Sequence, residues 1–439
     1  MPKGIIKFHI SFVEKAITKF GGLFLIHQFC QKLKLKRLLQ RHVKFQQSHQ
    51  QYYSSDLIIF ILYYIIAGIF RIDNTRSLQF NGVFKKLLGV KTFPNPTTIR
   101  RFLHKLPAKA IRQIIKVHDL LQEKLFFIGC PQTSMIFDLD PTAITVYGKQ
   151  IQRAKRGYDP KKRGRKCYCL ILCFEDNHQE FWYGTLQSGN TNAITLAKGF
   201  TKKCKTKLSK PIKRIRIRAD AGFYDGKFVK FLDEEGIIYT IEAQKSGVMQ
   251  NIIHSLKYQP YRDGWEISKF TYQPFHWEKP HWFIVKRHPV PEKREDWTQL
   301  ELNLTPIKGY LYRVLVTNLT TKPRHVWNFH HQRARGAEQN IKELKWNYPL
   351  TKIPTQSYTA NIAYLQLLLF AFNIVNWFKR LCLPKELRYK TLQTIRQDFI
   401  SIPARLIRSG DRNILKFPTA YPDQKLFCRV VKKIQNLKI

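Results

Sequence analysis

Acidic residues are scarce in this sequence. Its 439 residues include 76 lysines and arginines but only 30 aspartates and glutamates, which gives a formal net charge of +46. Such an excess is strongly self-repelling unless a polyanion is bound. A membrane surface or an acidic protein could neutralise it, but the basic residues run through the whole chain instead of forming one tail. We therefore expect nucleic acid as the partner.

The sequence also lacks the marks of a secreted protein. Its eight cysteines show no disulfide framework. Those in CYCLILC (167–173) would need a fourth ligand and a loop to bind zinc, and their spacing better suits a buried strand. Residues 1–17 contain no uninterrupted apolar core and no small-residue cleavage site, so we expect no signal peptide. A cytoplasmic, nucleoid-associated protein is the expectation.

Only two long apolar runs occur, and neither predicts a membrane span. Residues 56–70 form a run too short to cross a bilayer. Residues 359–378 are numerous enough, but this run contains four side-chain amides: Asn361, Gln366, Asn373 and Asn376. Such amides favour a core helix inside a globular domain, so we expect no membrane partner.

The segment FPNPTTIRRFLHKL (93–106) is a candidate DNA-reading element. Pro-Asn-Pro ends the preceding segment, and Thr97 or Thr98 can cap a helix that Arg100 and Arg101 then line. This pattern fits the recognition helix of a helix-turn-helix, and it fits a basic solvated helix equally well.

From residue 133 the pattern changes to strands alternating with helices. The expected elements are strands at 133–148 (interrupted by Pro141), 166–176 and 180–190, a helix at 191–208, a strand at 215–220, a helix at 225–236 and a strand at 237–244. Three meandering strands followed by α-β-α-β is the RNase H-like topology, in which the first and fourth strands are neighbours. The expected fold class is therefore α/β, with an RNase H-like mixed sheet flanked by helices.

The remaining segments complete the expected domain plan. Residues 245–325 are aromatic and strand-rich without a helix, residues 326–350 are helical again, and the chain ends in a basic segment. The plan is an N-terminal helical DNA-binding region at 1–125, an RNase H-like core at 126–245, a β-strand insertion at 246–325, the second part of the core at 326–385 and a basic tail at 386–439.

A small set of carboxylates falls on this sheet. Asp138 and Asp140 alternate on the first strand and share one face, while Asp220 ends the fourth strand, IRIRAD. The arginines that alternate along that strand suggest an edge facing DNA. Glu338 lies on the later helix among basic residues: Arg333, Arg335, Lys342 and Lys345.

Carboxylates gathered in one place repel one another unless a cation joins them. Mg²⁺ prefers oxygen ligands, and two such ions about 3.5–4 Å apart can activate the attacking oxygen and stabilise the leaving oxygen of a phosphodiester. Each acid also has a simpler explanation: Asp220 can cap a turn, and Glu338 can pair with Lys342 four residues on. Their combination, in this order, favours the metal site.

Five motifs in order resemble the DDE transposases of bacterial insertion sequences, in particular those with a β-strand insertion between the second Asp and the Glu. The resemblance covers roughly residues 90–380. Its motifs are DLDPT (138–142), GYDPKKRGRKCY (157–168), LQSGNT (186–191), RADAGF (218–223) and GAEQNIKELK (336–345).

The resemblance implies the identity of the catalytic acids. Asp140 fits the family's Asp-x-Thr pattern and is the first acid, with Asp138 in reserve, while Asp220 is the second acid and Glu338 the third. The same residues would bind Mg²⁺, with Mn²⁺ as a substitute, as two ions.

The resemblance also implies DNA contacts. Lys345 stands seven residues after Glu338, where the family has a lysine that contacts phosphate. The family's arginine and tyrosine positions are not matched, since Arg333 and Arg335 flank the expected arginine site and His331 replaces the tyrosine. Arg333 or Arg335 should still reach phosphate, and Lys342 is a further expected DNA contact. Stacking on a displaced base is a further role, for which five tryptophans are candidates by type only: Trp265, Trp277, Trp282, Trp297 and Trp327.

The activity implied is metal-dependent cut-and-paste transposition. Water would free a 3′-OH at the element's end, and that hydroxyl would attack target DNA without a covalent protein intermediate. The expected partners are the terminal inverted repeats, target DNA and a second copy of the chain in a homodimer. A catalytically inactive DNA-binding descendant and a nuclease of the same fold are the alternatives.

Overall fold

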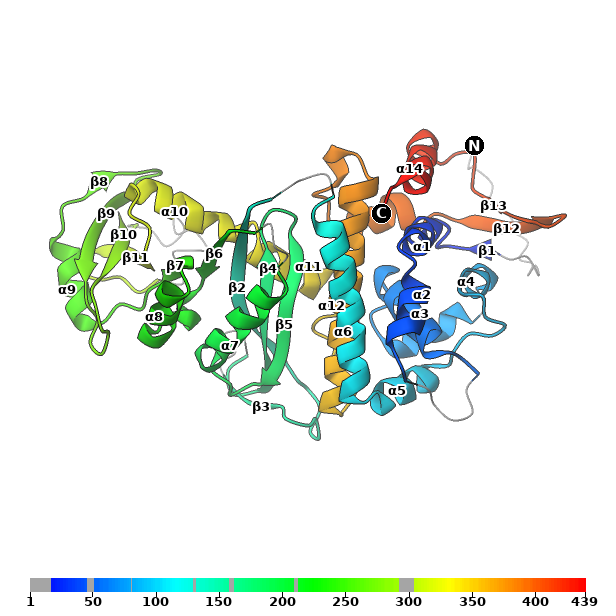
Figure 1. The fold of residues 1–439 in the computed structure, drawn as a ribbon, viewed down its shortest axis with the longest axis horizontal. Coiled ribbons are helices and arrows are strands. Elements are labelled where there is room, and N and C mark those ends of the chain that lie inside the picture. Colours follow the sequence, from blue (N-terminus) through cyan, green and yellow to red (C-terminus); the bar gives the residue numbers. More distant parts are fainter. Residues whose placement is uncertain are drawn as a thin grey trace, which may run out of the picture. The chain divides into compact units, whose positions relative to one another are not determined.

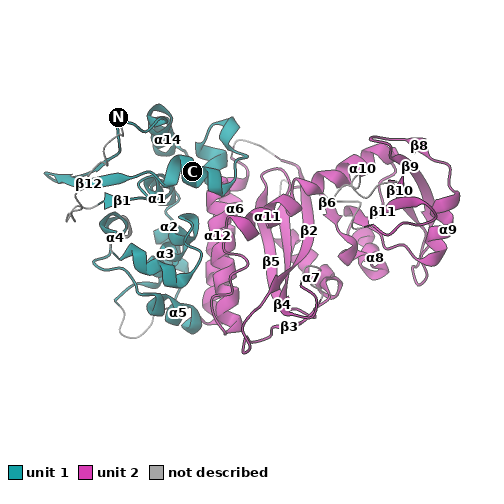
Figure 2. Cartoon of the chain, turned by 180° about the vertical axis from the view of Figure 1, so that it is seen from behind, with its two compact units in different colours: residues 1–105, 378–439 teal, residues 106–377 magenta. Residues whose placement is uncertain are grey.

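The chain folds into two compact units. A computed structural model describes residues 17–45, 51–79, 81–128, 132–157, 162–208, 212–291 and 304–439. The first unit combines residues 1–105 with 378–439, and the second comprises residues 106–377 (Figures 1 and 2). Helix α6 (Ala108–Phe126), which the sequence places in the N-terminal region, belongs to the second unit.

The first unit is mainly helical. Its helices are α1 (Leu23–Lys32), α2 (Leu35–His42), α3 (Ser54–Ile66), α4 (Gly82–Leu88), α5 (Pro96–Lys105), α13 (Leu392–Ile395) and α14 (Gln424–Asn436). Strand β1 (Ile17–Thr18) joins β12 (Ala404–Ser409) and β13 (Arg412–Lys416) in a small antiparallel sheet. The C-terminal residues, expected to form a basic tail, are therefore folded together with the N-terminal ones.

Helix α5 begins earlier than the sequence suggests. Its first residue is Pro96, so Thr97 and Thr98 lie inside the first turn and do not cap it. Proline suits the first helical position because the N–H group it lacks would have no partner there. Arg100 forms an ion pair with Asp73 at 2.5 Å, and Arg101 is exposed. Their contact with DNA stays a prediction.

The second unit contains a ten-stranded mixed sheet. Its strands are β2 (Ser134–Thr145), β3 (Lys155–Arg156), β4 (Lys166–Glu175), β5 (Glu180–Ser188), β6 (Arg214–Ala219), β7 (Ile238–Glu242), β8 (Gln259–Pro260), β9 (Glu266–Tyr272), β10 (His281–Pro289) and β11 (Tyr310–Thr317). The order β5-β4-β2-β6-β7, with β2 antiparallel to β4 and parallel to β6, confirms the RNase H-like topology predicted from the sequence.

Proline does not interrupt β2, contrary to the expectation. Pro141 pairs with Ile171 of β4 inside a continuous strand. The ladder between β2 and β6 ends at Leu139, so one side of β2 has no adjacent ladder at Pro141. A proline is tolerated at such an edge because its missing N–H group removes no hydrogen bond from that side.

The strand-rich insertion continues the central sheet. β11 pairs antiparallel with β7, and β10, β9 and β8 follow outward. The segment also contains helix α9 (Gly247–Ser255), so the expectation that it lacks a helix was wrong. Ser246 starts this helix by accepting a hydrogen bond from the backbone N–H of Met249, a local cap at the end of an otherwise strand-like pattern.

The two faces of β2 and β6 have different partners. Odd-numbered residues such as Phe137 and Ile217 enter the main core with helices α7 (Ala193–Thr206) and α8 (Gly226–Glu234). The other face carries the acids, and helix α11 (Ala337–Trp346) contacts it.

The long apolar helix α12 (Tyr358–Cys382) packs beside the edge strand β5. By length and composition it could cross a membrane, but 83% of its apolar window is buried inside the structure. Asn373 accepts the N–H of Phe181 and donates to the carbonyl of the same residue, both at 2.8 Å. Two further amides bond to carbonyls nearby, Gln366 to Gly184 and Asn376 to Gln179.

These amides explain why an apolar helix carries polar groups. The side of β5 turned away from β4 leaves backbone groups that need partners, and the amides of α12 supply them. The prediction of a core helix is thus consistent with each amide's contacts. Burial also lowers the pKa of His118 well below its usual value, which leaves its Nε2 neutral to accept from Asn373 at 2.8 Å.

Replacing Asn373 by leucine should destabilise the second unit. The substitution removes the partner of the buried N–H group of Phe181, whereas the carbonyl of Phe181 keeps the bond from Gln122, and a buried group left without a partner costs about 1–3 kcal/mol. The free energy of unfolding in urea measures the loss. Asn251→Leu, on the exposed face of α9, is the control, and equal losses in both variants would contradict the assigned role.

Candidate active site

Strand register brings acids from separate segments into one row. β2 and β6 pair in parallel, with Asp138 opposite Arg218 and Leu139 opposite Ala219. The next residue on each segment is an aspartate, so this register places Asp140 beside Asp220. β6 and β7 pair with Ala219 opposite Ile241, so the same step adds Glu242, the last residue of β7. The carboxyl ends of β6 and β7 therefore each carry an acid, and Asp140 lies next to them within β2.

Glu338 reaches this row from a helix that starts directly above β2. The predicted helical stretch 326–350 is in fact broken, since α10 (Pro323–His331) and a 3₁₀ turn (η5, Gln332–Ala334) precede α11. Gly336 lies at the break, where a Cβ atom would stand only 2.1 Å from Oδ2 of Asp138. Only glycine allows the backbone to pass this close, and Glu338 follows in the first turn of α11.

One arginine joins two of these acids. Arg333 donates from Nη1 to Oδ2 of Asp140 and from Nη2 to Oε1 of Glu338, each at 3.1 Å. Its side chain is 8% exposed, whereas that of Glu338 is 54% exposed. Glu338 is therefore bound to Arg333 and not, as the simpler explanation held, to Lys342 four residues on.

Negative charge at the row is only partly compensated. Burial raises the pKa of Asp140 to about 7; the Arg333 guanidinium opposes this rise, while Asp220 and Glu338 add to it. Burial likewise raises the pKa of Asp220 to about 6, against the effects of Arg333 and a backbone N–H group, with Glu242 and Glu338 adding to the rise. An additional cation near these carboxylates would stabilise their ionised forms.

Asp220 differs from its neighbours in its partner. Its Oδ1 accepts the backbone N–H of Gly222 at 3.1 Å, so it does cap the turn that follows β6. Glu242, in contrast, is held by Arg313 with an Nε–Oε1 distance of 3.1 Å. A cap uses one lone pair of the carboxylate and leaves the remaining oxygen positions of Asp220 for another ligand.

Arg218 forms a saturated network below the row. Its Nε and Nη2 donate to the two oxygens of Asp138 at 2.6 and 2.8 Å. Nη2 also lies 2.6 Å from Asp176, and Nη1 donates to the carbonyl of Phe329 at 3.0 Å and to the side chain of Gln332 at 3.4 Å. Both side chains of the central pair are 0% exposed.

This network contradicts the expectation that Arg218 faces DNA, and it gives a structural role to Asp138, the alternative to Asp140 as the first acid. Arg218 does not face DNA at a sheet edge, because it is buried in the pair with Asp138. Arg218 donates to both oxygens of Asp138, so this carboxylate holds Arg218 and is not the first acid of the proposed site, which is Asp140 two residues later. Burial raises the pKa of Asp138, and the Arg218 guanidinium opposes that rise.

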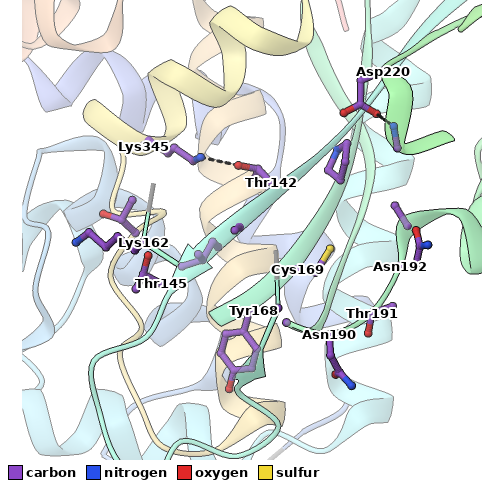
Figure 3. A pocket seen from close by; sticks show the side chains of 18 of the residues that line it. Thr142, Thr145, Lys162, Tyr168, Cys169, Asn190, Thr191, Asn192, Asp220 and Lys345 are labelled. Carbon is purple, nitrogen blue, oxygen red and sulfur yellow. Dashed lines mark hydrogen bonds between the residues drawn. The ribbon is translucent and has the colours of Figure 1, made fainter. Parts of the chain in front are cut away.

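A cavity of about 1100 Å³ opens next to Asp220. Figure 3 shows Thr142, Lys345 and Asn192 around it, and Nζ of Lys345 donates to Oγ1 of Thr142 at 2.5 Å. Asn190, from the predicted LQSGNT motif, also lines the cavity. Its polar wall adjoins one acid of the row, so a strand of nucleic acid lying there would approach Asp220.

The other residues predicted to contact DNA differ in how exposed they are. Arg335 and Lys342 are exposed, whereas Arg333 is buried among the acids. Of the five candidate tryptophans, Trp282 is 38% exposed beneath Lys269, and Trp327 is buried. Trp297 and residues 158–161 of the predicted GYDPKKRGRKCY motif lie outside the described residues.

The donor set fits a hard divalent cation in type. Carboxylate oxygens are the ligands Mg²⁺ prefers, and because burial raises the pKa of Asp140 and Asp220, a cation bound there would stabilise their ionised forms. Over the described ranges, however, no three His, Cys, Asp or Glu side chains are arranged as a metal site. The guanidinium of Arg333 stands between Asp140 and Glu338 instead.

Sequence reasoning missed the supporting residues of the site. Arg218 precedes Asp220 by two residues just as Asp138 precedes Asp140, so the parallel register of these strands could have predicted the pair. Glu242 could have been found in the same way, one strand further. No comparable signal marks Gln332 or Asp176, because their contacts depend on how distant segments meet.

Comparisons with known proteins concern the chain as a whole. The family described as "Transposase DDE domain group 1" matches residues 5–439. No curated protein matches the sequence at a significant level.

Three similar solved structures are also transposases. A piggyBac transposase in a synaptic complex with hairpin DNA is 10% identical with a TM-score of 0.48, and the match covers 88% of this chain and 82% of that one. A Mos1 transposase paired-end complex is 11% identical with a TM-score of 0.18, covering 45% and 60%. The Drosophila P element transposase is 14% identical with a TM-score of 0.21, covering 49% and 43%.

Replacing Asp138 by asparagine should strongly destabilise the second unit. The variant leaves the charge of Arg218 buried without its main partner, and breaking such a pair costs about 3–5 kcal/mol. Urea unfolding measures the change. The matched control is Asp73→Asn, which breaks the surface pair with Arg100 and should cost about 0–1 kcal/mol. Similar losses in both variants would show that the buried network has no special role.

Proposed function

The chain belongs to the family described as Transposase DDE domain group 1, and we propose that it performs cut-and-paste transposition at a site formed by Asp140, Asp220 and Glu338. Family membership makes it a transposase, an enzyme that cleaves DNA and transfers strands. The observation that supports this site is the convergence of three distant segments: Asp140 and Glu338 share Arg333, and strand register places Asp220 beside Asp140.

The three acids would hold Mg²⁺, or Mn²⁺ in its place, as two ions. Bound there, such ions activate an attacking oxygen and stabilise the leaving oxygen of a phosphodiester. Asp140 and Asp220 lie in the best position for this because strand register makes them neighbours, and the nearby guanidinium of Arg333 bonds to Asp140 and not to Asp220. Glu338 would close the site from the first turn of α11.

The surrounding residues would position the DNA. Lys345 is fixed by Thr142 on the wall of the cavity beside Asp220, where it can contact a phosphate of the scissile strand. Arg335 and Lys342 are exposed near the same helix and would contact the flanking backbone. The terminal inverted repeats and target DNA are the proposed substrates, and the formal net charge of +46 supplies the general attraction.

Two further parts of the proposal concern assembly. Arg100 and Arg101 on α5 would contribute to recognising the element's ends. Because two ends must be cut and joined together, the active form would be a homodimer, in which each copy supplies one set of the acids Asp140, Asp220 and Glu338.

Replacing Asp220 by asparagine should abolish strand transfer while leaving DNA binding intact. Asparagine keeps the shape and the cap on Gly222 but removes the charge. Even losing a hydrogen-bond partner of a metal ligand costs about 10–100-fold in metal affinity or activity, so a reduction of at least about 100-fold is expected. The assay is joining of DNA that carries the element's own ends, in Mg²⁺ or Mn²⁺, with binding followed by gel shift.

The matched control is the same substitution five residues later. Asp225 caps α8 by accepting the N–H of Phe228 at 2.9 Å, and asparagine caps a helix equally well, so Asp225→Asn should remain fully active. Strand transfer by Asp220→Asn at the wild-type rate would refute the site. A wild-type protein that cleaves without joining would instead be a nuclease, and one inactive in every divalent ion would be a DNA-binding descendant.

A further inference from the structure

Arg333 occupies an unusual position for an arginine expected to bind DNA. It bonds to Asp140 and Glu338, two of the three proposed metal ligands, and only 8% of its side chain is exposed. An arginine that received phosphate from the free protein's surface would be open to solvent, as Arg335 is two residues on. The partners of Arg333 are therefore inside the protein before DNA arrives.

The charge balance of the row shows what Arg333 contributes there. One guanidinium bonds to two of the three carboxylates, and the third, Asp220, accepts the backbone N–H of Gly222. A single positive charge therefore serves three acids. Glu242 adds negative charge nearby, but its own partner is Arg313.

We propose that Arg333 is a tethered counter-cation of the active site, which holds Asp140 and Glu338 in the free protein and must release them before a divalent ion binds. The inference rests on the proposed function, since it assumes that these acids are the ligands. A guanidinium and a metal ion would compete for the same carboxylate oxygens, and two cations about 4 Å apart repel each other strongly in a largely buried site. Arg333 must therefore move.

The structure allows the side chain to move without the backbone. The 3₁₀ turn that carries Arg333 is anchored on one side by Arg218, which donates to the carbonyl of Phe329 and to Gln332. On the other side the N–H of Gly336 bonds to the carbonyl of Arg333 at 3.1 Å. With the turn held at both ends, the flexible side chain alone carries the charge toward or away from the acids.

A DNA phosphate is the natural destination of the released guanidinium. Arginine binds phosphate through two parallel hydrogen bonds, with the same geometry that it uses for carboxylates. DNA lying along the cavity beside Asp220 and Lys345 would bring that phosphate close to the acid row. Arg333 would then move from carboxylate to phosphate, so DNA binding and metal binding would strengthen each other.

The test measures Mn²⁺ binding to the full chain without DNA, by the electron paramagnetic resonance signal of free Mn²⁺. Arg333→Gln should bind Mn²⁺ more tightly than the wild type, by roughly 5–150-fold, the range typical of coupled sites. Arg333→Lys keeps a positive charge and should bind more weakly than Arg333→Gln. Circular dichroism verifies that each variant is folded.

Arg214→Gln is the control for the loss of one positive charge. Arg214 is exposed at the opposite end of β6 from Asp220, about 20 Å away at about 3.3 Å per residue. Its substitution should leave the Mn²⁺ affinity unchanged. Tighter binding in this variant, to the same degree as in Arg333→Gln, would mean that net charge alone is responsible and would overturn the proposal.

The remaining outcomes separate this proposal from the proposed function. If Arg333→Gln binds Mn²⁺ no more tightly than the wild type while Asp220→Asn loses binding, the role of Arg333 is refuted and the metal site stands. If Arg333→Gln does not fold, the test is the Mn²⁺ affinity of the wild type with and without DNA. This affinity should rise roughly 5–150-fold when a duplex of the element's end is added. No rise would refute the exchange.

Discussion

The buried ion pair between Arg218 and Asp138 is the interaction on which the rest of the active site depends. It locks two parallel strands in register, and the same guanidinium reaches Asp176 and the chain near Phe329 that leads to α11. Removing two charges from water is costly, so such a pair adds little to stability compared with apolar packing. Its contribution lies in position: once Asp138 is opposite Arg218, the next residues on each strand bring Asp140 and Asp220 together.

The carboxylates have fewer positively charged partners the closer they lie to the solvent. The first pair is fully matched, Asp140 and Glu338 share one guanidinium, and Asp220 has a backbone cap as its partner. Beyond the acids lies a protein with a formal net charge of +46. Three carboxylates near one guanidinium, in a protein whose positive charge attracts phosphates, form an arrangement suited to metal-assisted cleavage of DNA.

The sequence predicted the topology because its signals are local. Alternating apolar residues marked the strands, and the β-β-β-α-β-α-β order defined the neighbours of β2 and β6. The amides of the 359–378 run likewise indicated a core helix, and the structure gives Asn373 a specific partner on β5. The chain's three proposed acids were placed on the correct elements for the same reason, although their catalytic role stays a prediction. What failed depends on contacts between distant segments: the continuous strand through Pro141, the break at Gly336, and the partners of Arg218 and Arg333.

The most direct test of the account is a crystal structure of the protein with Mn²⁺ and DNA from the element's end, with the ions located by anomalous scattering. The account predicts Mn²⁺ bound by carboxylate oxygens of Asp140, Asp220 and Glu338, at distances of about 2.0–2.2 Å, near those of Mg²⁺. It also predicts Arg333 on a phosphate rather than on Asp140. Mn²⁺ bound elsewhere, with Arg333 still joining Asp140 to Glu338, would contradict it.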